Sequence, residues 1–235
     1  MSLDEIMQQL QQWGSESIKK TLVNHGAREP FFGVKVEDLK KIQKVVKKNY
    51  PLSLDLFNTG NSDAMYLAGL ISDPAKMTRE NLNDWAEKAY WYMLSEFTIA
   101  WVASESPYGV EMGLKWIESE KENIATAGWS TLASIAAIKP DEEIDAKLYM
   151  HLLERISKTI HSEKNRVRHT MNNFVITVGG YCNHLQKEAN ETALTIGKVS
   201  VNMGGTACKV PLATDYIKKM HDRGSLGKKR KTAMC

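Results

Sequence analysis

The spacing of apolar residues along the chain follows the period of an α-helix almost throughout. Segment 141–161 is the clearest case, with an apolar residue at every fourth position: Ile144, Leu148, Leu152, Ile156 and Ile160. Its acidic start, DEEID, complements the positive N-terminal end of a helix. No run of residues alternates between polar and apolar in the way that a strand does. The pattern therefore predicts an all-α fold.

The same periodicity sets the expected helices and suggests a repeat. The helices are expected at 3–13, 15–25, 36–49, 51–58, 61–72, 78–89, 91–105, 108–119, 121–138, 141–161, 165–181, 184–197 and 211–223. Pro74, Pro107 and Pro140 lie 33 residues apart, each after an apolar helical stretch and before a new helix. This period fits helix pairs stacked in an α-α superhelix of the HEAT or tetratricopeptide type. A globular helical bundle with similar loops is the alternative.

Length and composition fit a folded protein with a sizeable core. The 235 residues are 43% hydrophobic and 25% charged, and no linker rich in Gly, Pro and Ser divides them, so we expect one domain at 1–223 followed by a basic tail at 224–235. The start, MSLDEIMQQLQQWG, lacks the basic patch and apolar stretch of a secretory signal, which favours a cytoplasmic protein without membrane contact. Cys182, Cys208 and Cys235 are far apart and lack partners at metal-binding spacing, so neither a disulfide framework, a metal nor a cofactor is predicted.

The charge is unevenly distributed along the chain. The net charge is only +3, but residues 198–235 hold nine Lys or Arg against two acids, or +7, which leaves −4 for the rest. A basic segment that ends in GKKRKTAMC suits a polyanion such as nucleic acid, although a solvated, frayed tail has the same composition. The candidate phosphate contacts here are Lys228, Lys229, Arg230 and Lys231.

A second basic surface is expected on the helix at 36–49. On a wheel of about 100° per residue, one side is apolar, with Val36, Leu39, Ile42, Val45 and Val46. The other side gathers the lysines Lys40, Lys41, Lys44, Lys47 and Lys48. Only Glu37 interrupts the basic side, whereas solvated faces usually mix both signs. The stripe is therefore either a phosphate-facing surface or a solvated face.

A polar stripe is expected on the helix at 165–181. Arg166, His169, Thr170, Asn173 and Thr177 fall on one side of the wheel, opposite apolar residues. No acid occurs between Glu163 and Glu188, which leaves Arg166, Arg168 and His169 unopposed in the local sequence. Donors that face one way suit sugar-phosphate contacts, so Arg166, Arg168, His169 and Asn173 are candidate DNA contacts. The alternative is an ordinary helix that exposes small polar residues.

The stretch AYWYMLSEFTIAW places one carboxylate, Glu96, among aromatic residues. Chemistry on a base or its sugar requires an aromatic wall and a carboxylate in the same small volume. On an α-helical wheel, Ser95 shares the face of Trp91 but Glu96 lies about 140° away. We therefore expect Glu96 to point away from Trp91 and most of these aromatic side chains to belong to the core.

Three stretches of the chain resemble the AlkD-like DNA alkylation repair family. They are PFFGVKVEDLKKI, the Trp91 helix, and IGKVSVNMGGTACKVPLATDYIKK, and the resemblance covers roughly residues 5–220. It implies HEAT-like helical repeats that grip duplex DNA in a basic concave groove. Active members are glycosylases that remove cationic alkylpurines with a Trp, an Asp one turn later, an Arg on a following helix and a further Trp.

The catalytic residues implied by this resemblance are largely missing. Trp91 matches the first Trp, but Ser95 stands at the Asp position and the later Trp falls on Phe174. No Arg matches in GWSTLASI. A shift of one residue would place Glu96 at the Asp position, so Trp91, Ser95 and Glu96 are the candidate catalytic positions.

Three functions remain open. The leading one is a DNA-binding HEAT-like repeat protein, for duplex or branched DNA, with weak or absent glycosylase activity, because Ser cannot stabilise an oxocarbenium-like sugar as a carboxylate does. The second is a working glycosylase that uses Glu96 or another acid. The third is a helical scaffold for a protein partner, because solenoid surfaces commonly bind peptides. The sequence leaves the oligomeric state open.

Overall fold

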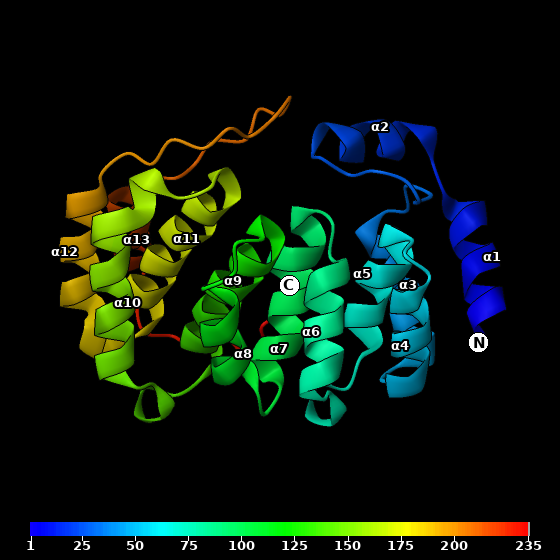
Figure 1. Cartoon of the computed structure of the whole chain (residues 1–235), viewed down its shortest axis with the longest axis horizontal. Coiled ribbons are helices and arrows are strands. Elements are labelled where there is room, and N and C mark those ends of the chain that lie inside the picture. Colours follow the sequence, from blue (N-terminus) through cyan, green and yellow to red (C-terminus); the bar gives the residue numbers. More distant parts are fainter. Residues whose placement is uncertain (235) are drawn as a thin grey trace.

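The computed structural model describes residues 1–234, and within them the fold is all-α, with no strand (Figure 1). The α-helices are α1 (Leu3–Trp13), α2 (Glu16–Asn24), α3 (Val36–Val46), α4 (Tyr50–Asn58), α5 (Ser62–Ile71), α6 (Arg79–Lys88), α7 (Ala100–Glu105), α8 (Gly109–Trp116), α9 (Glu122–Ile138), α10 (Ala146–Thr159), α11 (Asn165–Tyr181), α12 (Gln186–Ile196) and α13 (Ala213–Asp222). A π-helix, η2 (Met93–Ile99), leads into α7, and short 3-10 helices are η1 (Pro74–Lys76), η3 (Asp141–Glu143), η4 (Ile160–Ser162) and η5 (Asn183–Leu185). The predicted fold class is confirmed. None of the described helices is long and apolar enough to cross a membrane.

The helices stack as antiparallel pairs in two layers (Figure 1). One layer holds α4, α6, α8, α10 and α12; the inner layer holds α3, α5, η2 with α7, α9 and α11, and neighbours in it pack against one another. The three evenly spaced prolines each precede a helix of the first layer, since Pro74, Pro107 and Pro140 come before α6, α8 and α10. The proline period therefore marks the repeat of the stack, as predicted.

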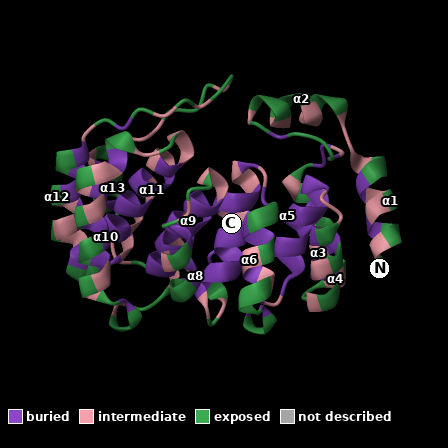
Figure 2. Ribbon diagram, viewed as in Figure 1, coloured by how far each residue is buried: buried purple, intermediate pink, exposed green. Residues whose placement is uncertain are grey.

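The core lies between the two layers, as Figure 2 shows by the buried colour of the central helices. All of α5 is buried, and so is most of α9. Glycines allow the closest approach: a Cβ on Gly128 of α9 would lie 2.7 Å from the Ile117 nitrogen, and one on Gly69 of α5 would lie 2.6 Å from Thr98 of η2. Gly128 thus lets α9 pack against the backbone at the end of α8, and Gly69 lets α5 pack against the Thr98 side chain.

Residues 224–234 form a strap across the C-terminal ends of the inner helices, here called the C-terminal strap. The Gly227 N–H donates to the Gly180 carbonyl of α11, and the Arg230 N–H donates to the Ala137 carbonyl of α9 (both 2.8 Å). Farther along, the Ala233 N–H donates to Glu105 of α7 (2.8 Å). Ala233 is buried. The composition of this segment was also compatible with a solvated, frayed tail. In the structure the segment is instead docked along the inner layer.

Three predicted helices differ clearly from those in the structure. The helix expected at 141–161 begins only at Ala146, after the N-cap Asp145, and the acidic start Asp141–Glu143 forms the separate 3-10 helix η3. The helix expected at 36–49 ends at Val46, because Lys47 has a positive φ of 59° and breaks the helix. The helix expected at 91–105 begins with the π-helix η2, which changes the angular positions of its side chains.

Candidate functional site

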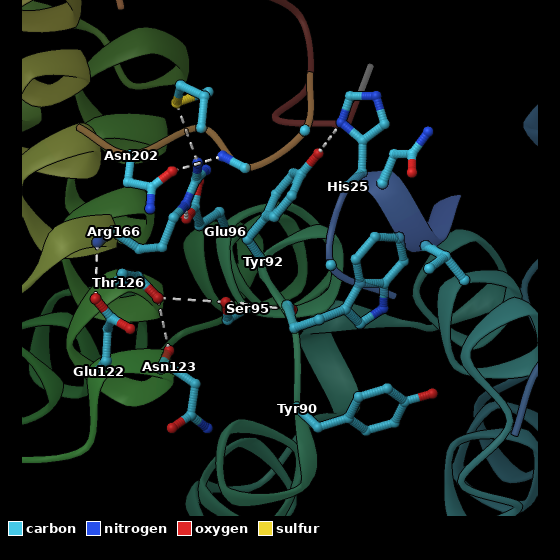
Figure 3. Close-up of a pocket in the computed structure, with 17 residues that line it drawn as sticks. His25, Tyr90, Tyr92, Ser95, Glu96, Glu122, Asn123, Thr126, Arg166 and Asn202 are labelled. Atoms are coloured by element: carbon cyan, nitrogen blue, oxygen red, sulfur yellow. Dashed lines mark hydrogen bonds and ion pairs between the residues drawn. The ribbon is translucent and has the colours of Figure 1, made fainter. Parts of the chain in front are cut away.

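The main cavity, here called the aromatic cavity, has a volume of about 560 Å³ and lies where η2, α9 and α11 begin (Figure 3). Its walls come from the end of α2, the stretch before η2, the first turns of α9 and α11, and the loop after α12. The lining residues are Val23–Gly26, Tyr90, Trp91, Tyr92, Ser95, Glu96, Glu122, Asn123, Thr126, Arg166 and Asn202–Gly205. Segments from both ends of the chain therefore meet at this site.

A buried ion pair joins η2 to α11 in the wall of the aromatic cavity. Arg166 donates from Nε to Glu96 Oε1 (2.7 Å) and from an Nη to Glu96 Oε2 (2.6 Å). The side chains are only 4% and 16% exposed for Glu96 and Arg166. His169 Nδ1 lies 3.4 Å from the same carboxylate. Glu96 is thus held by a two-point contact that compensates its charge.

The prediction that Glu96 points away from Trp91 is wrong. Both residues line the aromatic cavity. The wheel assumed α-helical geometry, but Met93–Ile99 is a π-helix, in which hydrogen bonds link residues five apart. Trp91 lies in a bend before this π-helix, so a wheel with one fixed angle per residue cannot relate its side chain to that of Glu96. Trp91 is at once mostly buried and part of the cavity wall.

Ser95, the other candidate catalytic position, is 1% exposed and its hydroxyl makes only structural contacts. Its Oγ accepts a hydrogen bond from Thr126 of α9 (3.2 Å) and lies 3.5 Å from the Trp91 carbonyl. Figure 3 shows Ser95 joined to Thr126. The side chain at this position therefore ties η2 to α9.

Arg166 is unopposed in the local sequence, as expected, but its acid Glu96 comes from a distant part of the chain. The guanidinium also lies over the Tyr92 ring, 4.3 Å from the ring centroid. Tyr92 in turn places its hydroxyl 2.8 Å from His25 Nδ1, beyond the end of α2. Burial raises the pKa of the Tyr92 phenol, so it keeps its proton at neutral pH. This network links α2, η2 and α11.

Sequence inspection missed two polar residues at the start of α9. Glu122 Oε1 accepts the Arg166 N–H (2.7 Å) and so satisfies a free donor in the first turn of α11. Asn123 donates both amide hydrogens to carbonyls of α6 and its end, Ala86 and Ala89. The only sequence signal for Glu122 is an acid at a helix start, which occurs too often to be diagnostic.

The polar stripe of α11 continues into a second hollow, here called the central groove. It has a volume of about 450 Å³ and lies between η2, α7, α9, α11, α13 and the C-terminal strap. Asn173 and Thr177 line this groove, whereas Thr170 is buried. Glu96 borders both hollows, so the ion pair with Arg166 stands between them. The expected stripe is thus divided between two hollows.

The five lysines of segment 36–49 do not form one stripe. Lys41 pairs with Asp38 (2.6 Å) and lies over the Trp13 ring, whereas Lys47 and Lys48 lie beyond the end of α3. Val45, expected in the core, is 69% exposed. Lys44, Lys47 and Lys48 do line one hollow of about 380 Å³, here called the lysine hollow, together with Thr232 and Met234 of the C-terminal strap. Two basic segments far apart in sequence are thereby brought together.

The four basic residues of the strap have different surroundings. Lys229 pairs with Asp141 (2.8 Å) and donates to the Ala136 carbonyl at the end of α9 (2.9 Å). Arg230 is half-buried and borders the central groove. Lys228 and Lys231 are exposed. Lys229 is therefore a structural anchor, and Lys228 and Lys231 are left facing solvent.

Two further positions that the sequence analysis singled out lie outside the lining of the aromatic cavity. Arg168, on another side of α11, donates to Asn165 (3.3 Å). Phe174, the position that matches the family's later Trp, is fully buried between Trp129 and Tyr149. It belongs to the core.

Comparison with known proteins identifies the family of the chain. The sequence model of a family described as DNA alkylation repair enzyme matches residues 6–192. The chain belongs to the DNA alkylation repair enzyme family. Among its relatives, the uncharacterized protein Lin0241 of Listeria innocua is 35% identical and the uncharacterized protein Lmo0209 of Listeria monocytogenes 34% identical, each over 95% of this chain and 99% of the relative.

A solved structure resembles the whole chain. Its TM-score is 0.92 at 37% identity, with 100% of both chains covered, and it is described as a new family of proteins related to the HEAT-like repeat DNA glycosylases with affinity for branched DNA structures. The family membership and the HEAT-like repeat fold expected from the sequence are thereby confirmed.

Proposed function

We propose that this protein binds DNA, branched DNA in particular, and that its alkylpurine glycosylase activity is weak or absent. The first part is supported by the family and by the branched-DNA affinity in the description of the similar structure. The second part is supported by the state of Glu96. A carboxylate held at both oxygens by a guanidinium presents little net negative charge to a cation that forms nearby.

The position one turn after Trp91 supports the same conclusion. Ser95 carries no charge and is buried against α9. The loss of one charge contact to a transition state costs about 3 to 4 kcal/mol, or about 10² to 10³ in rate. A protein that keeps the DNA-binding fold but lacks this contact would bind without efficient cleavage.

One observation favours a second candidate function, a glycosylase that uses Glu122. Its Oε1 accepts the Arg166 N–H, so the carboxylate is held at one oxygen by a neutral backbone donor and not by a guanidinium. Glu122 lies on α9 and borders the same hollow as Trp91. This arrangement would supply the carboxylate that Ser95 does not.

Release of 7-methylguanine and 3-methyladenine from alkylated duplex, under single-turnover conditions, separates the two functions. We expect little release by the unmodified protein. Robust release that is abolished by Glu122→Gln and kept by Glu96→Gln would establish the second candidate. Robust release abolished by Glu96→Gln would instead make Glu96 the catalytic carboxylate.

Binding is tested independently of cleavage by fluorescence anisotropy. A three-way junction, a duplex and a single strand of equal length are titrated with the protein at two salt concentrations. We expect the junction to bind most tightly, and binding to weaken as salt rises. Equal, salt-independent binding of all three DNAs would contradict the proposed function and favour a protein partner.

A further inference from the structure

We propose that the aromatic cavity takes one unpaired nucleobase at the branch point of a DNA junction. This inference rests on the proposed function and specifies what the cavity holds. The volume of about 560 Å³ falls within the range of small-molecule sites, roughly 300 to 1,000 Å³. A branch point differs from a duplex in offering bases that are not stacked on both sides, so a cavity for a single base would recognise it.

The aromatic wall of the cavity suits a flat heterocycle. Tyr90, Trp91 and Tyr92 are consecutive and all border the hollow. Trp91 and Tyr92 meet edge to face, with ring centroids 5.5 Å apart. Unpaired bases are commonly held by aromatic side chains, because every base has a π-face that can stack regardless of its sequence. This wall distinguishes the cavity from a simple gap between helix ends.

Two polar side chains of the lining have unused bonding capacity. Trp91 is more than nine-tenths buried, and its Nε1–H, which is itself covered by protein, finds no acceptor within residues 1–234. Asn123 uses both amide hydrogens on carbonyls of the protein, so only its Oδ1 is left to accept a further hydrogen bond. The inference therefore rests on stacking against the aromatic wall and not on recognition of the base edge.

The charges in the cavity favour a base over a phosphate. Glu96 and Glu122 outnumber Arg166, so the lining carries a net negative charge when His25 is neutral. The single guanidinium is already occupied by Glu96. A phosphate would therefore meet uncompensated carboxylate charge, whereas a base would not. Phosphates are better placed against the exposed lysines of α3 and the strap.

The cavity mouth offers a way to block the site without disturbing the core. Gly205 borders the cavity, and a Cβ added to it would meet no atom within 4 Å. Gly205→Phe should therefore fill open space at the mouth. Gly205→Ser is the matched control. Asn24→Trp, at the exposed end of α2 beside Gly204, adds a bulky side chain to the same mouth from a different segment of the chain.

The test is a thermodynamic cycle that compares the affinities of the open and the blocked protein for junctions with and without the unpaired base. Two three-way junctions are compared by anisotropy: one has a single unpaired adenine at the branch point, and the other has an abasic site there. For the unmodified protein and Gly205→Ser, we expect the adenine junction to bind at least about fivefold more tightly, because stacking of one base on an aromatic side chain contributes that factor or more. For Gly205→Phe and Asn24→Trp, we expect the two junctions to bind within about twofold of each other.

A fluorescent base gives a second measurement on the same junction. With 2-aminopurine at the unpaired position, stacking in the cavity should lower the emission on binding, and the blocked variants should lose this decrease. Equal affinity for the adenine and abasic junctions by the unmodified protein, or an undiminished difference in both folded blocked variants, would overturn the inference. Neither result would affect the proposed function, which fails only if no DNA binds in a salt-dependent way.

Discussion

At the scale of the residue, the ion pair of Glu96 with Arg166 determines how much charge these two side chains present to the aromatic cavity. The two groups are 70 positions apart in sequence and meet through two short hydrogen bonds. Neither charge is well hydrated, because both side chains are mostly buried. Each therefore depends on the other, and a lone carboxylate or guanidinium at this place would be strongly unfavourable.

Removal of one partner of this pair should destabilise the protein more than removal of both. Arg166→Met leaves Glu96 buried and unpaired, and should lower the free energy of unfolding by about 3 to 5 kcal/mol. The double variant Glu96→Gln, Arg166→Met should recover a large part of this loss. Urea denaturation monitored by circular dichroism measures the free energy of unfolding of the single and double variants. Additive effects of the two single substitutions would show that the pair is not coupled.

At the scale of the element, the π-helix and the C-terminal strap position the site. The π-helix η2 places Glu96 in the wall of the aromatic cavity, and the strap ties together the ends of α7, α9 and α11. Lys229 places a positive charge at the C-terminal end of α9, where the helix dipole is negative. The strap is thus held by backbone hydrogen bonds and by one ion pair.

Acidification should loosen the strap at its ion pair. Burial tends to raise the pKa of Asp141, but hydrogen bonds from Lys229 and Asn183 outweigh it and hold the pKa below its ordinary value of 3.8. Since the folded pKa is depressed, the stabilisation is complete above about pH 4 and is lost as the pH falls through the lower, folded value. The protection factors of the Arg230 and Gly227 amides against hydrogen exchange should therefore fall in that window. Asp141→Asn should show fast exchange at neutral pH as well, and unchanged exchange in this variant would contradict the role of the pair.

The contact between α8 and α9 should tolerate no side chain at Gly128. A Cβ there would lie 2.7 Å from the Ile117 nitrogen and 2.9 Å from the Gly113 carbonyl oxygen, and backbone atoms cannot move aside as a side chain can. Gly128→Ala should therefore lower the melting temperature and cost about 1 to 3 kcal/mol, despite the better helix propensity of Ala. Gly205→Ala, in open space, is the control. A more stable Gly128→Ala protein would show that the two helices can separate at little cost.

At the scale of the whole molecule, the superhelix gathers basic residues that the sequence keeps apart. Lys44, Lys47 and Lys48 share the lysine hollow with Thr232 and Met234 of the C-terminal strap, and Lys228 and Lys231 are exposed earlier on the strap. Two acids oppose these lysines: Glu105 borders the hollow, and Asp73 pairs with Lys48 (3.7 Å). This arrangement makes the lysine hollow and the exposed strap lysines the strongest candidates for phosphate contacts.

Removal of the charge on these lysines should weaken DNA binding and reduce its dependence on salt concentration. Replacement of Lys44, Lys48, Lys228 and Lys231 by Gln should weaken binding to all sequences alike, and should make the dependence of log K on log salt shallower by about one unit for each lost contact. Anisotropy titrations at several salt concentrations measure the slope. The matched control is Lys158→Gln, whose charge pairs with Glu154 on α10. An unchanged slope in the fourfold variant would place the DNA elsewhere.

The sequence by itself determined the all-α fold, the repeat and most helix boundaries. Helical periodicity is a local property, so α1 and α11 begin and end at the residues that it predicts. Evenly spaced prolines likewise mark the start of successive helices, because Pro disfavours a helical conformation in the residue before it. The family resemblance carried by the terminal motifs was also confirmed over most of the chain.

Only the tertiary structure decided how the candidate residues are combined. A wheel with a fixed angle per residue cannot represent a π-helix, so it placed Glu96 on the wrong side of Trp91. Local sequence cannot show that the acid opposite Arg166 comes from a helix 70 residues away, or that Lys229 docks onto α9. These contacts form between elements that are distant in sequence, and their energies arise from burial and charge compensation that exist only once the layers have packed.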